Sequence, residues 1–220
     1  MMSLTEAENV FAGLNETGLN DMLRAIFTAR PRLLNYRTSP AVTNNPVSAS
    51  AWTTVPVIAF PGVPGGIEYA VQFDIPQSDI APQSAALPPP LTLGPGQISL
   101  RTAVTLTLLC RSRQGGNDQQ PAGTSISVGL EAAAVGRIVV RSVGLGSGSI
   151  AFDLQRVELV DVTPEKLESL LECLILTFLR GALASVELPF SAIRLGAFSL
   201  NLLRGPESED DQLKLYGAAV

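Results

Sequence analysis

The chain has 220 residues, of which 46% are hydrophobic, 16% are charged and 5% are aromatic. This length and apolar content suffice to bury a substantial core and exclude an intrinsically disordered chain. The 19 glycines and 16 prolines follow no fixed period, which excludes collagen and disfavours an all-helical fold. The composition therefore indicates a β-rich globular protein.

The residue counts also limit the available chemistry. The sequence has no histidine and only two cysteines, which excludes Ser-His-Asp and Cys-His catalytic arrangements and the common zinc sites. We therefore expect a protein that is not an enzyme, with no catalytic residue, no metal site and no cofactor. The net charge of −5 would repel a phosphate backbone, so no nucleic-acid partner is expected.

The first residues, Met1 to Glu6, do not form a basic segment followed by an apolar run, so no secretory signal peptide is visible. The longest apolar stretch, 170–186, is interrupted by Glu172 and Arg180 and is too short and polar for a membrane span. We therefore expect a cytoplasmic location and no transmembrane segment, and export by another route stays open.

A helix is predicted near the N-terminus, where apolar residues recur at helical spacing from Leu19 to Phe27. Asn15 is a suitable N-cap for this helix, and Pro31 is a stop signal at its other end. The preceding segment, 4–14, is compatible with either a second helical piece or a short strand.

Residues 38–97 are poor in charge and rich in proline, and we assign them to the same domain as the rest of the chain. Helices are disfavoured here because proline lacks an amide donor and clashes inside a helix. Short strands are predicted at 55–60 and 68–75, the second of which shows alternating apolar residues.

Longer strands follow this segment. Apolar residues alternate with mostly polar ones from Ile98 to Leu108, which places every second side chain on one face of a strand. Further strands are predicted at 125–135, 137–143 and 150–160. The turns between these long strands are short and rich in glycine, which indicates an antiparallel meander.

The periodicity changes at Thr163-Pro164-Glu165, which has the cap, the proline and the acidic residue of a helix start. The helix predicted over 163–186 is apolar nearly all round in its middle turns, which favours burial on two sides. Strands are predicted after it at 197–203 and 212–216, with a solvated hairpin turn at 207–211 between them.

The two cysteines lie at the end of a predicted strand and inside the second helix, at Cys110 and Cys173. They are either two buried, reduced thiols or a disulfide that ties the sheet to the helix. A disulfide requires Cα atoms within about 7 Å and an oxidising compartment. The residues alone leave both alternatives open.

Four segments carry a family resemblance: 15–20 at the first helix, Val157–Asp161 with Thr163-Pro164, the apolar helix over 167–183, and Leu188-Pro189 with 196–200. In their order they resemble the tubular lipid-binding (TULIP) superfamily, which includes BPI-like domains, related to bactericidal/permeability-increasing protein, and synaptotagmin-like (SMP) lipid-transfer modules. The resemblance implies a single α+β domain over 1–220. In it, a curved antiparallel sheet wraps a long C-terminal helix, with a shorter N-terminal helix. Some secreted members join sheet and helix by one disulfide, which the resemblance places between Cys110 and Cys173.

These observations lead to the hypothesis that the protein binds a lipid or another apolar ligand between the long helix and the sheet. The residues expected to line this site are Leu167, Leu170, Leu171, Leu174 and Phe178 on the helix and Val104, Leu106 and Leu108 on the sheet. The alternative is a structural or protein-interaction subunit with a solid core and no ligand. In that case charge-free segments such as 41–64 would form an interface with a protein partner or within a homo-oligomer.

Overall fold

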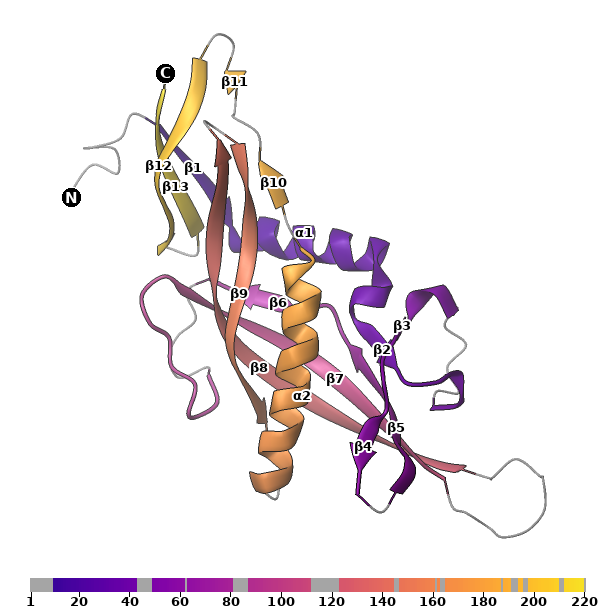
Figure 1. The fold of residues 1–220 in the computed structure, drawn as a ribbon. Coiled ribbons are helices and arrows are strands. Elements are labelled where there is room, and N and C mark those ends of the chain that lie inside the picture. Colours follow the sequence, from indigo (N-terminus) through magenta and orange to yellow (C-terminus); the bar gives the residue numbers. More distant parts are fainter. Residues whose placement is uncertain are drawn as a thin grey trace, which may run out of the picture.

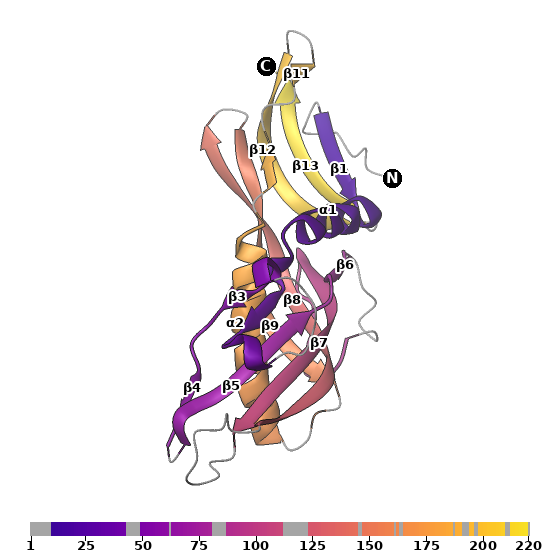
Figure 2. The same cartoon turned by 90° about the vertical axis from the view of Figure 1, so that its right-hand side faces the viewer.

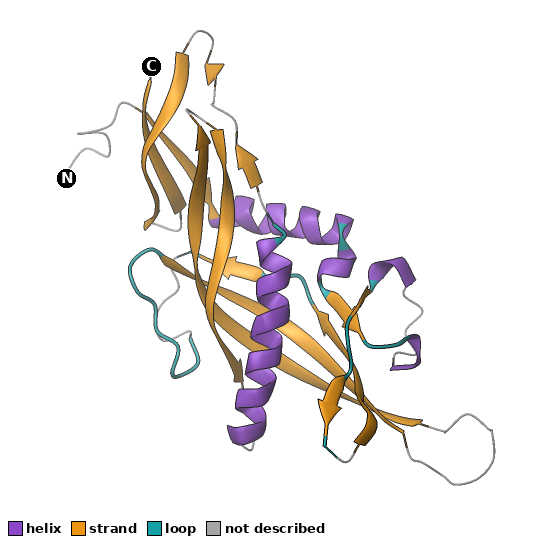
Figure 3. Ribbon diagram, viewed as in Figure 1, coloured by secondary structure: helices purple, strands orange, loops and turns teal. Residues whose placement is uncertain are grey.

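The computed structural model shows a mixed α+β fold with a large curled sheet, a smaller sheet and two α-helices among the described residues (Figure 1). The helices are α1 (Glu16–Ala29) and α2 (Glu165–Ala184), drawn in purple in Figure 3. Short 3₁₀ turns follow α1 at η1 (Pro31–Leu33), η2 (Pro40–Val42) and η3 (Ala49–Ala51). The described residues are 10–42, 49–61, 63–80, 87–111, 123–144, 147–160, 162, 165–186, 188–190, 194–195, 198–209 and 212–219.

The larger sheet is a curled half-barrel with nine strands (Figure 2). Its spatial order is β10 (Leu188–Phe190), β9 (Ser147–Val160), β8 (Gly123–Gly144), β7 (Gln97–Arg111), β5 (Val63–Phe73), β2 (Asn35–Arg37) and β3 (Thr53–Thr54). Two short strands pair beside this path, β4 (Ile58–Phe60) with β5 and β6 (Gln77–Asp79) with β7. The pairing of β2 with β3 is parallel, and the other pairs are antiparallel.

The predicted antiparallel meander is confirmed, because β7, β8 and β9 are consecutive neighbours in the sheet. The two strands predicted at 125–135 and 137–143 are wrong, because β8 runs through Gly136 without a break. At Gly136 the ladder shifts register, and an added Cβ would lie 2.7 Å from the carbonyl oxygen of Asp153. Glycine here therefore permits the close approach of two strands rather than a turn.

The first helix follows the sequence prediction closely. The Asn15 side chain accepts a hydrogen bond of 2.8 Å from the amide of Gly18, which satisfies one of the free donors of the first turn. Leu19, Leu23 and Phe27 form the buried side of α1, as the helical spacing of these residues predicts. The predicted cap and apolar side are both confirmed.

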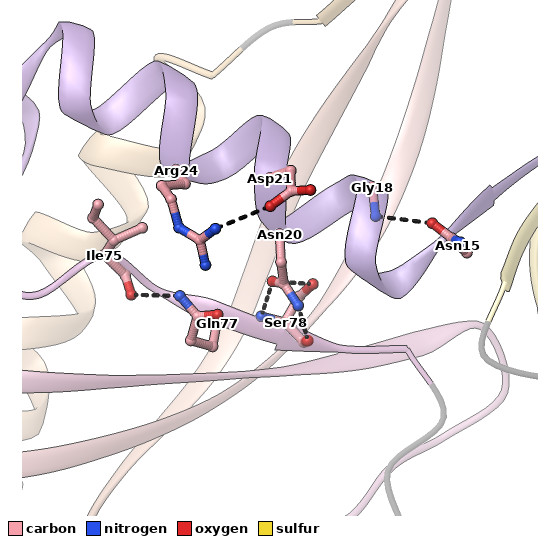
Figure 4. Close-up of polar contacts among 8 residues, drawn as sticks. All are labelled: Asn15, Gly18, Asn20, Asp21, Arg24, Ile75, Gln77 and Ser78. Carbon is pink, nitrogen blue, oxygen red and sulfur yellow. Dashed lines mark hydrogen bonds and ion pairs between the residues drawn. The ribbon is translucent and has the colours of Figure 1, made fainter.

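Hydrogen bonds also fasten α1 to the edge strand β6 (Figure 4). The amide and hydroxyl groups of Ser78 donate to the Asn20 side-chain oxygen at 2.7 and 2.9 Å, and the Asn20 side-chain nitrogen donates to the Ser78 carbonyl at 2.9 Å. Because Ser78 is buried, these bonds satisfy polar groups that water does not reach. This contact fixes α1 across one end of the half-barrel.

The second helix is the longer one, but it is not the C-terminal element. The chain continues after α2 through β10, β11 (Arg194–Leu195), β12 (Phe198–Glu209) and β13 (Gln212–Ala219). Strands follow the helix as predicted for 197–203 and 212–216, so α2 is C-terminal only to the main strands, and a mixed α+β fold with a curled antiparallel sheet is confirmed. The helix runs beside β9 (Figures 1 and 2).

The smaller sheet joins the two ends of the chain. Its order is β1 (Val10–Asn15), β13, β12 and β11. The segment before α1 thus contains a strand. Of the two alternatives for 4–14, a helical piece or a short strand, the strand is confirmed from residue 10 onward. The acidic segment predicted as a hairpin turn is strand β12 up to Glu209, with Glu207 opposite Lys214, and 210–211 lie outside the described residues.

The outer face of the larger sheet is covered in part by the proline-rich segment. Leu87 and Leu91 are buried against Ala133 and Val135 of β8, and Leu93 packs beside them. A separate cluster on the same side contains Val42, Trp52, Ala70 and Leu109. At these positions the apolar residues of this charge-poor segment cover the sheet.

The main core lies between the two helices and the inner face of the half-barrel. It contains side chains from α1, α2 and strands β2, β5, β7, β8, β9 and β13. On α2 the fully buried members are Ile175, Leu179, Ala182 and Leu183. Both helices therefore cover the same face of the sheet, and this is the face on which the candidate site lies.

Candidate functional site

The candidate site is an apolar surface on the inner face of the half-barrel, centred on the predicted residues Val104, Leu106 and Leu108 of β7. Directly opposed residues of antiparallel strands share a face, so the register identifies their neighbours. These neighbours are Phe73, Val71 and Tyr69 on β5 and Leu130, Val128 and Ile126 on β8. The set is apolar apart from the tyrosine hydroxyl, and we call it the inner apolar surface.

Exposure along β8 rises toward one end of this surface. Ala132 is fully buried, whereas Val128 is 45% exposed and Ile126 is 53% exposed. The register gives the cause, because the pairing of β9 with β8 ends at Val160, opposite Glu131. The part of β8 that precedes residue 131 extends beyond the end of β9, and its inward apolar side chains meet solvent.

The neighbouring strands show the same gradient. On β7, Val104 and Leu106 are buried, and Leu108 is only partly buried. On β4, Ile58 lies opposite Ile67 of β5 and is 37% exposed. The half-barrel is therefore packed at one end and open at the other.

Helix α2 does not repeat this gradient strictly, because Ile175 is 2% exposed although it precedes the partly buried Phe178. Leu179 and Leu183, in its C-terminal half, are fully buried. Leu171, Leu174 and Phe178 come earlier in the helix, are partly buried and pack against the main core. The structure thus brings three of the five predicted helix residues into the same apolar cluster as the predicted residues of β7.

The remaining predictions for α2 fare differently. Leu170 is 66% exposed on the side of the helix that also carries Cys173 and Thr177, so α2 is not buried all round. Cys173 lies on this solvent side and is a free cysteine with an exposed side chain. The prediction of a buried thiol is therefore wrong for Cys173, and Cys173 forms no disulfide. The side chains of Leu167 and Cys110 lie outside the described residues.

An aromatic cluster joins α2 to strands β2 and β5. The ring of Phe178 stacks on that of Tyr36 with centroids 4.5 Å apart, and it lies 6.3 Å from the ring of Tyr69. Tyr36 also meets Phe73 edge-on at 6.3 Å. The Tyr36 hydroxyl donates to the carbonyl oxygens of Leu33 at 2.7 Å and of Phe178 at 3.4 Å. Burial raises the pKa of Tyr36 to about 12, so this hydroxyl stays a donor at neutral pH.

The other side of α2 is fastened to the free edge of β9. The amide of Leu159 donates to a carboxylate oxygen of Glu172 at 3.2 Å. The Arg180 guanidinium donates to the carbonyls of Leu154 at 2.8 Å and Gln155 at 3.2 Å. A helix that covers a sheet edge satisfies backbone groups that would otherwise be open to another strand. The helix therefore bridges β9 on one side and β2 with β5 on the other.

Three glutamates meet at the seam between α2 and β9. One carboxylate oxygen from each of Glu158, Glu168 and Glu172 lies within 4.8 Å of the others. Burial raises the pKa of the Glu158 carboxyl, and repulsion from Glu172 and Glu168 and a hydrogen bond with Glu172 raise it further. Sequence reasoning missed this cluster, although the four-residue spacing of Glu168 and Glu172 places them on one side of a helix. Acidic side chains alone do not define a metal site.

One hollow at the closed end of the half-barrel has no room for a ligand. This hollow is too small for a water molecule and is lined by Ile98, Leu100, Gly136, Arg137, Phe152, Asp153 and Leu154. Toward the other end, Ile126 and Val128 have exposed side chains. Sequence reasoning missed these two residues, although both continue the alternation of the strand predicted at 125–135.

Comparisons with known proteins add little to this geometry. No protein-family model matches the sequence, and no curated protein matches it. A crystal structure of lipopolysaccharide binding protein is similar to the chain at 13% identity and a TM-score of 0.38, over 100% of this chain and 46% of that protein. The chain thus spans about half the length of that protein. A likeness this low does not show family or function, so membership of the TULIP superfamily stays a prediction. Among the described residues, no helix is both long and apolar enough to cross a membrane.

Proposed function

We propose that the protein is a non-enzymatic binding protein, which holds a lipid or another apolar ligand between α2 and the inner apolar surface. The graded exposure of this surface carries the proposal. Ile126 and Val128 are exposed at the open end and continue directly into the buried core. Ligand sites are usually concave and apolar, and exposed apolar patches on soluble proteins commonly mark binding surfaces.

The proposal includes the finer fold that the sequence suggested, a TULIP-like sheet wrapped around α2, and a cytoplasmic protein that meets its ligand there. Binding would be driven by burial of hydrocarbon, which contributes about 0.8 kcal/mol for each methylene removed from water. About ten buried methylenes would give about 8 kcal/mol before the cost of association is subtracted. We therefore expect dissociation constants in the micromolar range or weaker.

The experiment compares two neighbouring substitutions on opposite faces of β8. Ile126→Asp places a charge on the inner apolar surface, and Ser125→Asp places the same charge on the outer face at another exposed position. An unpaired charge in an apolar site is costly, so Ile126→Asp should weaken uptake of a fluorescent fatty acid by about tenfold or more. Ser125→Asp should leave uptake unchanged. Native mass spectrometry before and after delipidation identifies any ligand carried through purification.

The result that would overturn the proposal is a wild-type protein with a clean apo mass spectrum and no fatty-acid uptake. Equal loss of uptake in both variants would also count against the inner surface, because only the charge and not its face would then matter. Circular dichroism checks that both variants are folded.

The second candidate is an interaction subunit with a solid core. One observation favours it, namely that the hollow at the closed end does not admit a water molecule. On this alternative, a protein partner or a second copy of the chain would cover the exposed apolar residues. A stable oligomer at micromolar concentration, together with no ligand uptake, would support it over the binding protein.

A further inference from the structure

Strand β8 has an unpaired edge beyond the end of β9 (Figure 1). The pairing of β8 with β9 ends at Glu131, and within the described part of the chain residues 124–130 pair only with β7, on their other side. Residues 125–129 are all exposed, and a Cβ added at Gly129 would meet nothing within 4 Å. This free edge, as we call 124–130, therefore offers a row of backbone amide and carbonyl groups to another extended chain.

Other edges of the larger sheet carry features that natural sheets use against such pairing. β3 is very short, and β10 is short and has Pro189 at its centre. The edge of β9 is covered by α2 through the hydrogen bonds of Glu172 and Arg180. In contrast, residues 123–130 contain neither a proline nor a charged side chain. The free edge of β8 therefore lacks the protection that these other edges have.

We propose that the free edge pairs with the same edge of a second copy of the chain, so that two antiparallel β8 strands join two copies into one continuous sheet. This inference does not rest on the proposed function. A row of backbone donors and acceptors selects an extended strand as its partner, and a hydrocarbon ligand on the inner apolar surface would leave that row unpaired.

Charge and symmetry favour a second copy as the partner. The free edge is uncharged, so two copies of it meet without repulsion there, although each chain carries a net charge of −5. A matching strand needs apolar side chains on the side of Ile126 and Val128 and small polar ones on the side of Ser125 and Ser127. The free edge has this alternation itself. A two-fold axis brings one surface patch against its own copy, so the free edge is self-complementary.

The length of the free edge sets the register of the pair. Its midpoint is residue 127, so a two-fold axis there pairs the whole of 124–130 with its copy. Directly opposed residues share a face, so Ile126 of each copy lies opposite Val128 of the other, on the inner side. Ser127 lies opposite Ser127 of the second copy, on the outer side. The two Glu131 side chains fall at opposite ends of the paired segment and do not meet.

The test introduces charge at Ser127, which lies on the proposed axis and is exposed. In wild type, analytical ultracentrifugation from about 1 to about 100 µM should show a monomer–dimer equilibrium, because one pair of strands is a small interface. Ser127→Lys and Ser127→Glu each place like charges opposite one another and should weaken the dimer about tenfold or more. An equimolar mixture of the two variants should dimerise again, because the opposed charges then differ in sign.

Ser127→Ala is the matched control. The hydroxyl groups of Ser127 and Thr107 form a hydrogen bond of 2.9 Å, and each substitution at 127 removes it. Alanine removes this bond without adding charge, so Ser127→Ala should dimerise as wild type does. Because residue 127 lies on the outer side, fatty-acid uptake should be the same in wild type and in these variants. Circular dichroism checks that each variant is folded.

The outcomes separate this pairing from the proposed function. A wild type that stays monomeric throughout the range overturns the pairing of two copies and leaves the free edge to an extended segment of another protein. A dimer of unchanged strength in Ser127→Lys and Ser127→Glu overturns it as well, because the contact then lies elsewhere. Dimerisation of the mixture, but of neither charged variant alone, supports the axis at Ser127. Absence of fatty-acid uptake in a wild type that dimerises overturns only the proposed function.

Discussion

Replacing Leu179 by alanine is expected to destabilise the protein far more than replacing Leu170 by alanine in the same helix. Leu179 is fully buried in the main core, and Leu170 is 66% exposed. A buried Leu→Ala substitution costs about 2–5 kcal/mol, through lost burial and the cavity left behind. An exposed one changes stability by no more than about 0.5 kcal/mol, and alanine is the better helix former. The free energies of unfolding of the two variants should therefore differ by about 3 kcal/mol.

Urea unfolding followed by circular dichroism measures this difference, and thermal melts check it. For a chain of this size, 3 kcal/mol corresponds to a melting temperature lower by about 6–12 °C. The denaturant dependence should stay the same in both variants, since neither changes the surface exposed on unfolding by much. Equal losses from Leu179→Ala and Leu170→Ala would refute the orientation of α2, and with it the packing of α2 on the main core.

Three further variants test other contacts. Glu158→Gln should make the protein more stable at pH 7. The pKa of Glu158 is raised in the folded protein, so this carboxyl stabilises the fold fully only at acid pH. That stabilisation is lost as the pH rises above 4.5 and through the folded-state pKa. Urea unfolding from pH 4 to pH 8 should accordingly show a flatter profile for the variant, and unchanged profiles would contradict the raised pKa of Glu158 that burial and the neighbouring glutamates cause. Asn20→Ala should cost about 2 kcal/mol, because the buried amide and hydroxyl of Ser78 lose their acceptor; a loss below about 0.5 kcal/mol would contradict this. Gly136→Ala should cost about 1–3 kcal/mol, because its Cβ would crowd the facing strand, and a neutral effect in a thermal melt would show that the strands can separate there.

Local signals in the sequence predicted the elements whose structure depends on nearby residues. Asn15 caps α1, and the apolar spacing from Leu19 to Phe27 forms its buried side. The alternation from Ile98 to Leu108 lies within a single strand. These features depend on periods of two and 3.6 residues, which a sequence displays directly.

Features that depend on distant partners could not be predicted in the same way. The helical period of α2 does not show which apolar side meets the sheet, since Leu170 and Cys173 belong to a nearly continuous apolar stretch. Only packing against β9 and β2 leaves them in solvent. In the sequence, Gly136 predicts a break between two strands, because the sequence does not show that another strand approaches this glycine closely. The pairing of β1 with β13 joins segments nearly the whole chain apart.

The open end of the half-barrel follows from the unequal lengths of its elements. β8 has 22 residues and β9 has 14, while α2 has 20 residues at a rise of about 1.5 Å each and covers only about 30 Å. No arrangement of one such helix covers a strand that extends about 70 Å. If the part of β8 that precedes Glu131 had no role beyond pairing with its neighbours, both of its faces could carry polar residues. Instead, β8 keeps isoleucine and valine inward at 126 and 128 and places serine outward at 125 and 127. Ile126 and Val128 thus stay 53% and 45% exposed, and covering them is what the proposed function assigns to an apolar ligand.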